Sequence, residues 1–280
     1  MLKPSTRSRH RRFTPRPTSR RRRAMGQHFL SSRAAVTRLI DLFAPVAGEH
    51  VLEIGSGRGA LTDPLLEAGV RLTAIELDPD LASRLASRHA GNDRLRLVQA
   101  NVLECDLTEL AAPAARVIAN LPYSITGEVL HRLLLAGPPI TYLMLMLQRE
   151  VVNRIVASPG GRVYGSLSVL SQYFTQPVTL MTLAPGSFTP PPAVSSSVVS
   201  MPFRPLPREI PPDGEAAYAR FIRELFAHRR QTLLNNLKAA RPGRAPELPA
   251  LLAELGIDPG RRPETLARHE CLSLHRALLI

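Results

Sequence analysis

The stretch HVLEIGSGRGA, residues 50–60, decides the fold. Its apolar beginning predicts a buried strand over residues 50–54, and its glycines predict a tight turn into a helix near residues 60–68. The next apolar run, RLTAI (71–75), is followed directly by Glu76. Such glycines let the backbone approach a nucleoside, and an acid about 20 residues later accepts hydrogen bonds from both ribose hydroxyls. The stretch therefore predicts a nucleoside cofactor.

The alternation of short strands and helices continues along the chain, with a helix expected at about 80–89. Apolar runs predict three further strands, at RLRLV (95–99), ARVIA (115–119) and TYLMLML (141–147). Two more runs, VTLMTL (178–183) and SSVVSM (196–201), have no helix between them, which predicts an antiparallel hairpin at the far edge. We expect an α/β fold, with a Rossmann-like, doubly wound sheet of seven mostly parallel strands.

A separate helical domain is predicted after residue 202. The segment RPLPREIPP (204–212) is expected to be a linker, because its prolines deny hydrogen bonds to helices and to strands. Helical spacing of apolar residues predicts helices within 215–241, 247–255 and 264–279. The expected organisation is a basic arm over 1–23, a cofactor-binding domain over 24–202 and a small all-helical domain over 203–280.

Positive charge is concentrated at the two ends of the chain. The 280 residues carry a formal net charge of +13. Residues 1–23 contain ten Lys or Arg and no acid, residues 24–202 contain 13 basic and 14 acidic residues, and residues 203–280 contain 13 and 9. A near-neutral body between basic ends is typical of a protein that binds a polyanion such as RNA. The arm is expected to be disordered when free, with an organellar transit peptide as the alternative.

Composition also excludes several classes of protein. No apolar run approaches the roughly 18 residues that a membrane-spanning helix needs, so we expect no membrane partner. The two cysteines, Cys105 and Cys271, lack the spacing of a disulfide framework or of a metal site, and we expect no metal. A reducing, cytoplasmic location is expected.

The glycine turn leaves the class of cofactor open. Gly55, Gly57 and Ala60 also satisfy the dinucleotide fingerprint, and a purely structural turn is a further alternative. Glu53 favours S-adenosylmethionine, because a carboxylate there can hold loop amides or the ammonium of a methionine group but would repel a pyrophosphate. Glu53, Gly55, Gly57 and Glu76 are therefore expected to bind S-adenosylmethionine.

The tetrapeptide Asn120-Leu121-Pro122-Tyr123 follows the strand expected at 115–119, at the edge where open α/β sheets bind ligands. The N6 amine of adenine is a poor nucleophile, because its lone pair is delocalised into the ring. Acceptors that draw the amine towards a pyramidal geometry would activate it, and Asn120 offers its side-chain oxygen and Leu121 its main-chain carbonyl. Pro122 stiffens the turn, and Tyr123 presents a flat face to a flipped base. These residues predict transfer of a methyl group to adenine.

Together with other segments, this tetrapeptide resembles the KsgA-type rRNA adenine N6,N6-dimethyltransferases, which act on small-subunit ribosomal RNA. The resemblance covers residues 24–280. It rests on GQHFL (26–30), the turn from Glu53 to Gly59, IELD (75–78), NLPYSI (120–125), MLQREVVNRIV (146–156), YGSLS (164–168) and FTPPP (188–192). It implies a class I methyltransferase fold, with S-adenosylmethionine as the cofactor.

The resemblance implies roles for residues at matched positions. His28 and Leu30 would line the methionine end of the cofactor, above the loop that contains Gly55. Asn101 would bind the adenine amine of the cofactor, and Asn120 would contact both the cofactor and the target base. Phe188 would stack on the target adenine opposite Tyr123, with a hydrophobic plug between domains as its alternative role.

Several positions depart from the family pattern. The family usually has Asp where this chain has Asn101, so a neutral amide oxygen would replace a carboxylate at the cofactor adenine, with Asp106 as the alternative acceptor. His28 and Ser124 stand where many relatives have Asn. The long arginine-rich arm is not a general feature of the family either.

The helical domain resembles the RNA-docking module of the family. Residues 228–232 and 235–236 are expected to form its polar face, where Arg229 and Arg230 would contact phosphates and Asn235 would contact RNA. The alternative for each residue is a solvated helix face.

The sequence thus predicts an enzyme that methylates N6 of adenine in small-subunit rRNA, and the resemblance to the family implies that it dimethylates two adjacent adenosines in the hairpin near the 3′ end of that RNA. Its partner would be this RNA or the precursor of the small ribosomal subunit, and a monomer is expected. Three alternatives are a resistance-type large-subunit rRNA methyltransferase, a non-catalytic assembly factor and an NAD-linked oxidoreductase.

Overall fold

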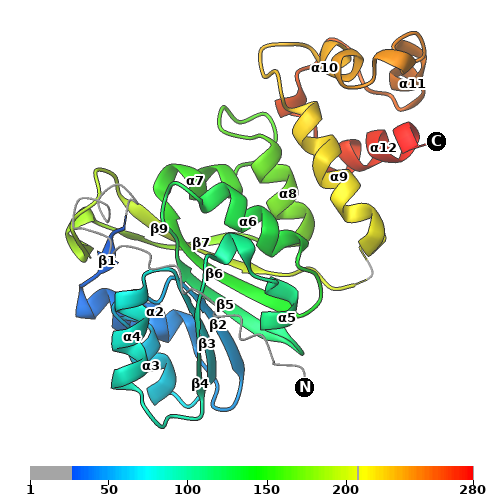
Figure 1. Ribbon diagram of the computed structural model, residues 1–280. Coiled ribbons are helices and arrows are strands. Elements are labelled where there is room, and N and C mark those ends of the chain that lie inside the picture. The colour runs from blue at the N-terminus through cyan, green and yellow to red at the C-terminus, as the bar shows by residue number, and fades with distance from the viewer. Residues whose placement is uncertain (1–26, 207, 280) are drawn as a thin grey trace, which may run out of the picture.

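The computed structural model describes residues 27–206 and 208–279. The arginine-rich arm predicted over 1–23 lies outside these residues. Figure 1 shows a layered α/β body that carries a group of helices at its C-terminal end.

One sheet of seven strands forms the centre of the body. Its spatial order is β4 (Leu95–Gln99), β3 (Arg71–Glu76), β2 (His50–Ile54), β5 (Ala115–Asn120), β6 (Ile140–Gln148), β9 (Ser196–Pro202) and β7 (Val178–Leu183). The first five strands are parallel, whereas β9 is antiparallel to both β6 and β7. The seven-stranded, mostly parallel sheet is confirmed, and its antiparallel edge arises because β9 inserts between β6 and β7.

Helices cover both faces of the sheet (Figure 1). One apolar core cluster joins the sheet to α2 (Arg33–Phe43) and α3 (Thr62–Glu67), and α4 (Pro79–Arg88) lies on the same side. The other cluster joins the opposite face to α5 (Leu107–Ala111), α6 (Thr126–Leu135), α7 (Arg149–Ile155) and α8 (Ser166–Phe174). Because both faces are covered, the central strands β2, β5 and β6 are mostly buried along their length rather than on alternate residues.

A second, two-stranded sheet joins segments far apart in the sequence. In it β1 (Phe29–Leu30) pairs antiparallel with β8 (Phe188–Thr189), which follows the short helix η2 (Pro185–Ser187). The main-chain amides of Ser31 and Ser32 both donate to the carbonyl of Ser187, at 2.9 and 3.2 Å. This pairing fastens the beginning of the described chain beside the carboxyl ends of the central strands.

The C-terminal region is helical, as predicted. It contains α9 (Pro212–Leu225), α10 (Leu233–Ala240), η3 (Pro242–Arg244), α11 (Leu248–Glu254), η4 (Pro263–Thr265) and α12 (Arg268–Leu279). The helical spacing over 215–241 is interrupted at residues 226–232, which form a loop. The buried side chain of Asn236 holds this loop, because it accepts from the amide of His228 and donates to the carbonyls of His228 and Thr232.

The proline-rich segment before α9 contains no helix or strand over its described residues, yet it is fixed to the body. The Arg204 guanidinium donates to the carbonyl of Gln172, and the Ile210 amide donates to the Tyr173 hydroxyl. Arg208 forms a bidentate ion pair with Glu215, and both side chains are about 95% buried. The apolar core continues across this junction, because Tyr173 on α8 packs on Tyr218 on α9 with ring centroids 4.8 Å apart.

Arg116 on β5 ties α2 to the sheet. Its guanidinium lies over the rings of Phe43 and Tyr142, 4.1 and 4.8 Å from their centroids. The same group donates to the carbonyls of Phe43 and Ala44 at the end of α2 and forms an ion pair with Glu49. It therefore satisfies carbonyls that the helix itself leaves unpaired.

We expect Arg116→Ala to lower the free energy of unfolding by about 2 to 3 kcal/mol, because it removes charge-assisted hydrogen bonds and stacking together. Urea unfolding followed by circular dichroism measures the change. The side chain of Arg96 on β4 is exposed and forms no hydrogen bond or ion pair with any described residue, so Arg96→Ala is the matched control. Equal stabilities of the two variants would contradict the role given to Arg116.

Candidate active site

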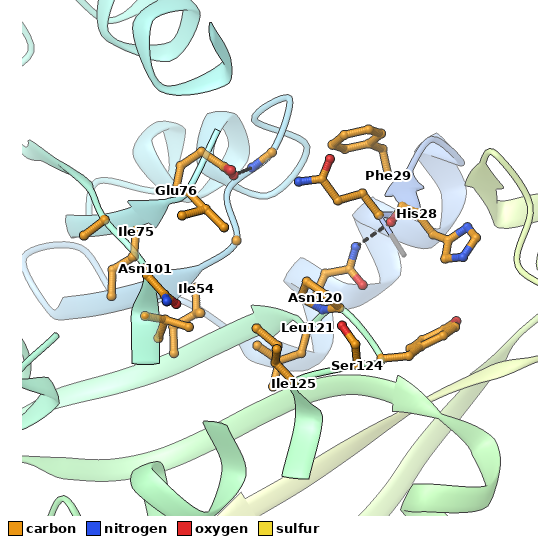
Figure 2. Close-up of a pocket in the computed structure, with 18 residues that line it drawn as sticks. His28, Phe29, Ile54, Ile75, Glu76, Asn101, Asn120, Leu121, Ser124 and Ile125 are labelled. Carbon is orange, nitrogen blue, oxygen red and sulfur yellow. Dashed lines mark hydrogen bonds between the residues drawn. The ribbon is translucent and has the colours of Figure 1, made fainter. Parts of the chain in front are cut away.

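A cavity of about 290 Å³ opens at the carboxyl ends of β2, β3 and β5. Figure 2 shows Glu76 and Asn101 towards one end of it and His28 and Asn120 towards the other. Eighteen residues line the cavity, and the glycine turn, the end of β3 and the tetrapeptide after β5 all contribute to it. The structure therefore brings together the two motifs that the sequence analysis singled out.

The glycine turn approaches its neighbours too closely for side chains. Gly55 and Gly57 have φ angles of +77° and +56°, which L-residues rarely adopt. A Cβ at Gly55 would lie 3.3 Å from the Asn120 carbonyl oxygen, and one at Gly57 would lie 3.1 Å from the ring of Phe29. The two glycines thus allow the turn, the end of β5 and the beginning of β1 to meet around one cavity.

Glu76 holds the glycine turn and lines the cavity. One carboxylate oxygen accepts from the amide of Gly57 at 2.7 Å, and the other accepts from the amide of Asp78 at 2.8 Å. Burial raises the pKa of this carboxyl, and the two hydrogen bonds oppose the shift. Each oxygen keeps a second lone pair, so the geometry allows the predicted contact with ribose hydroxyls.

Glu53 does not line the cavity, and the expected contact with a methionine ammonium is not what the structure shows. Neighbouring residues of a strand face opposite sides of the sheet, so Ile54 enters the cavity while Glu53 points towards α3. There its carboxyl accepts from the Thr62 hydroxyl at 2.7 Å. Burial raises the pKa of Glu53 to about 8, so the group is mostly protonated at neutral pH.

The Asn120 amide is oriented by the chain before β1. Its nitrogen donates to the main-chain carbonyl of His28 at 3.0 Å (Figure 2). Because the donor end is engaged, the acceptor end Oδ1 is left for a ligand, and it accepts no hydrogen bond from the described residues. Leu121 and Pro122 continue the cavity wall. The carbonyl of Pro122 accepts hydrogen bonds from the amide of Ile125 and from the hydroxyl of Thr126.

Tyr123 forms part of the cavity wall beside Asn120. Its hydroxyl shares a 2.8 Å hydrogen bond with the hydroxyl of Ser196 on β9. Its ring lies 5.6 Å from the His28 ring, at an interplanar angle of 33°. The His28 ring is itself held, because Nδ1 lies 2.7 Å from the carbonyl oxygen of Pro190 and donates to it.

Asn101 lines the cavity, but its amide is already engaged. Its oxygen accepts from the Leu103 amide at 3.1 Å and so caps the short helix η1 (Val102–Glu104). Its nitrogen donates to the Glu104 carboxylate at 3.0 Å. The alternative acceptor, Asp106, caps α5 by accepting from the amides of Thr108 and Glu109.

Leu30 and Phe188 are not at the cavity. They are register partners in the β1–β8 pair, and this pairing turns both side chains into the core cluster beneath. Phe188 is only 3% exposed, so in this conformation it cannot stack on a base. The core cluster around it contains no described residue of the C-terminal helices, so a plug between domains is not what the structure shows either.

Two polar residues of the site were missed by the sequence analysis. Gln27 lines the cavity, and Ser56 lies buried in the glycine turn. Gln27 Oε1 and the Ser56 hydroxyl are buried and have no hydrogen-bond partner in the part of the chain that the structure describes. Gln27 belongs to GQHFL (26–30) and Ser56 to the glycine turn. The sequence could have indicated both, because each is a polar residue next to a residue predicted to bind the ligand.

The residues expected to contact RNA differ in their exposure and in their hydrogen bonds. Arg230 and Asn235 are exposed, whereas Asn236 is buried and serves the loop. Arg229 is exposed too, but its guanidinium donates to the carbonyls of Arg162 and Tyr164 at 2.7 and 3.2 Å. Arg229 therefore ties the loop after α9 to the loop before α8.

The chain that builds this site is similar to known proteins over most of its length. The family model described as Ribosomal RNA adenine dimethylase matches residues 18–277. The chain belongs to this family. It is 42% identical over 266 residues to the ribosomal RNA small subunit methyltransferase A of Geobacter sulfurreducens, with 93% of this chain and 96% of the relative covered. It is 39% identical over 256 residues to the protein of that name from Acinetobacter baylyi, with 90% of each covered.

Solved structures share the fold of this dimethylase. A dimethyladenosine transferase from Plasmodium falciparum superposes with a TM-score of 0.73 at 21% identity, covering 88% of this chain and 96% of that one. The 23S rRNA methyltransferase ErmE superposes with a TM-score of 0.66, also at 21% identity, covering 90% and 100%. At these identities the likeness concerns the fold, so it does not choose between RNA substrates.

Membership of the dimethylase family makes the chain an S-adenosylmethionine-dependent rRNA adenine dimethyltransferase. The cavity fits this cofactor, because its wall offers an acid for a ribose and the buried, unpartnered Oε1 of Gln27. Among the described residues, no group of acidic, histidine or cysteine side chains could hold a metal ion. No helix within the described ranges is long and apolar enough to cross a membrane.

The raised pKa of Glu53 predicts a pH dependence of stability. Between the ordinary value of 4.5 and about 8, the unfolded chain releases the proton that the folded chain keeps, so rising pH favours unfolding. Glu53→Gln has no proton to lose at this position, so its stability should not fall with rising pH for this reason. Relative to the wild type, we expect the variant to gain on the order of 3 kcal/mol between pH 5 and pH 8.

Urea unfolding of both proteins at the two pH values measures this gain. The control is Glu67→Gln, which replaces an exposed acid on α3 and should leave the difference from the wild type unchanged with pH. A pH-independent difference for Glu53→Gln would show that the Glu53 carboxyl is ionised in the folded protein.

Proposed function

We propose that this dimethyltransferase acts on two adjacent adenosines in the hairpin near the 3′ end of small-subunit rRNA and converts each to N6,N6-dimethyladenosine during subunit assembly. The small-subunit assignment is supported by full-length relatives of about 40% identity that carry that name. The observation that carries the chemistry is the orientation of Asn120, whose acceptor oxygen is left for a ligand at the cavity wall. The enzyme would work in the cytoplasm as a monomer.

The residues around the cavity suggest how the reaction proceeds. S-Adenosylmethionine, when bound, supplies a methyl group on a sulfonium centre. Glu76 and the glycine turn would hold its ribose, with Asn101 and Gln27 at the wall on either side. Asn120 Oδ1 and the carbonyl of Leu121 would accept hydrogen bonds from the target N6 amine. These bonds would draw the amine towards a pyramidal geometry, in which its lone pair can attack the methyl carbon. The alkylated amine then loses its proton to water.

Tyr123 would supply a stacking face for the extruded base, because it lies beside Asn120 on the same turn. After the first transfer the amine keeps a single N–H. One acceptor then suffices, and the second transfer requires only that the methylated amine rotate its remaining hydrogen towards Asn120 or Leu121.

The test of this function is the transfer of labelled methyl groups into small subunits that lack the modification, followed by mapping of the modified nucleotides. We expect the label at two adjacent adenosines. Label in large-subunit RNA would instead support the resistance-type alternative.

Asn120→Ala separates catalysis from binding. Removal of one oriented polar contact from a reacting centre costs about 10²- to 10³-fold in rate, and we expect a loss of this size in methyl transfer. Binding of the variant to small subunits, measured by filter retention, should stay within a few-fold of the wild type. Asn153→Ala, on the exposed side of α7, is the matched control. Full activity of Asn120→Ala would overturn the role proposed for this amide.

For residues 203–280 we propose a role in docking rRNA, with residues 24–202 as the methyltransferase domain. The loop at 227–231 supports this, because it exposes Arg230 beside a shallow hollow and joins the helical region to the body through Arg229. Phosphate contacts made there would be sensitive to salt.

Arg230→Ala should weaken binding to small subunits and lower the slope of log K against log salt by about 0.7 to 1, without loss of thermal stability. Arg229→Ala should also lower the melting temperature, because it breaks the hydrogen bonds to Arg162 and Tyr164. Arg84→Ala, an exposed arginine on α4, is the control for both measurements. An unchanged melting temperature for Arg229→Ala would contradict the tie between the two loops.

A further inference from the structure

Tyr123 is held by two side chains that do not belong to its own turn. Ser196 contacts its hydroxyl at 2.8 Å, and the His28 ring lies 5.6 Å from its ring. Ser196 is 1% exposed and does not line the cavity. Whatever Ser196 contributes to the reaction must therefore pass through Tyr123.

Ser196 is itself in a fixed position. It opens β9, between Gln148 on β6 and Leu183 on β7 in the register of the sheet. The next residue, Ser197, is equally buried, but its hydroxyl bonds to Thr182 at 3.1 Å. Because neighbouring residues of a strand face opposite sides of the sheet, only Ser196 can reach Tyr123.

The two contacts restrict different motions of the tyrosine. The hydrogen bond to Ser196 fixes the position of the far end of the ring, and so the direction of the side chain. The neighbouring His28 ring, at 33°, limits rotation of the Tyr123 ring about that axis. A base that stacks on the ring takes its plane from it, and reacting atoms must be aligned closely for efficient transfer.

We propose that Ser196 is a positioning residue for methyl transfer, which fixes the ring of Tyr123 through its hydroxyl and thereby sets the plane of the target adenine. The inference rests on the proposed function, because it assumes that the base stacks on Tyr123. It adds a residue on β9, 73 positions away in the sequence, to a site otherwise built from the glycine turn, the tetrapeptide and the segment before β1.

The test is a double-mutant cycle on Ser196→Ala and Tyr123→Phe, which break the same hydrogen bond from its two ends. We expect each single variant to lower the single-turnover rate of methyl transfer about tenfold, with the affinity for S-adenosylmethionine and for small subunits unchanged. The double variant should be no slower than either single variant. Tyr123→Phe leaves β9 untouched, so it tests the bond even if Ser196→Ala fails to fold.

Ser197→Ala is the matched control, because it removes an equally buried, hydrogen-bonded hydroxyl from the same strand. It should retain the wild-type rate. Equal rates for Ser196→Ala and Ser197→Ala, or independent losses that multiply in the double variant, would overturn the proposal. Failure of the proposed function is distinguishable, since the wild type itself would then not modify small-subunit RNA.

Discussion

A single hydrogen bond, from the amide nitrogen of Asn120 to the main-chain carbonyl of His28, governs the direction of the acceptor on which the chemistry depends. An amide has a donor end and an acceptor end, and engagement of the donor end leaves the oxygen as the group presented to a ligand. The bond needs the segment before β1 to lie across the end of β5. That placement in turn needs the glycine turn, where a Cβ would lie only 3.3 Å from the Asn120 carbonyl oxygen at Gly55 and 3.1 Å from the Phe29 ring at Gly57.

The sequence predicted the elements of this site better than it predicted the direction of individual side chains. The seven strands follow from apolar runs, and the meeting of the glycine turn with Asn120 follows from the common edge of parallel strands. Glu53 was wrongly expected at the ligand, because the motif gives its position along the strand but not the face on which it lies. Phe188 was expected at the base, whereas its pairing with Leu30 in β1–β8, which no local pattern predicts, turns it into the core.

Polar residues near helix ends were equally hard to assign from sequence. Asn101 was expected to bind the cofactor and Asn236 to lie on the polar face that docks RNA. Both side chains instead form hydrogen bonds with the adjoining main chain. Short polar side chains compete for nearby backbone groups, and only the local fold decides whether any capacity is left over. The same holds for arginines near the helical region. Arg229 donates to the carbonyl of Arg162, and Arg208 forms an ion pair with Glu215, so both connect neighbouring segments.

The pairing of β1 with β8 has a consequence for biogenesis of the enzyme. Residues 28–31 reach their final place only against residues 187–190, about 160 positions later in synthesis. The five parallel strands can assemble as the chain emerges from the ribosome, but His28 cannot be locked above Asn120 until that later stretch has been translated. A nascent chain that ends before residue 187 would therefore contain the glycine turn and the tetrapeptide 120–123. It would still lack residues 187–190, which hold His28 in place beside Asn120.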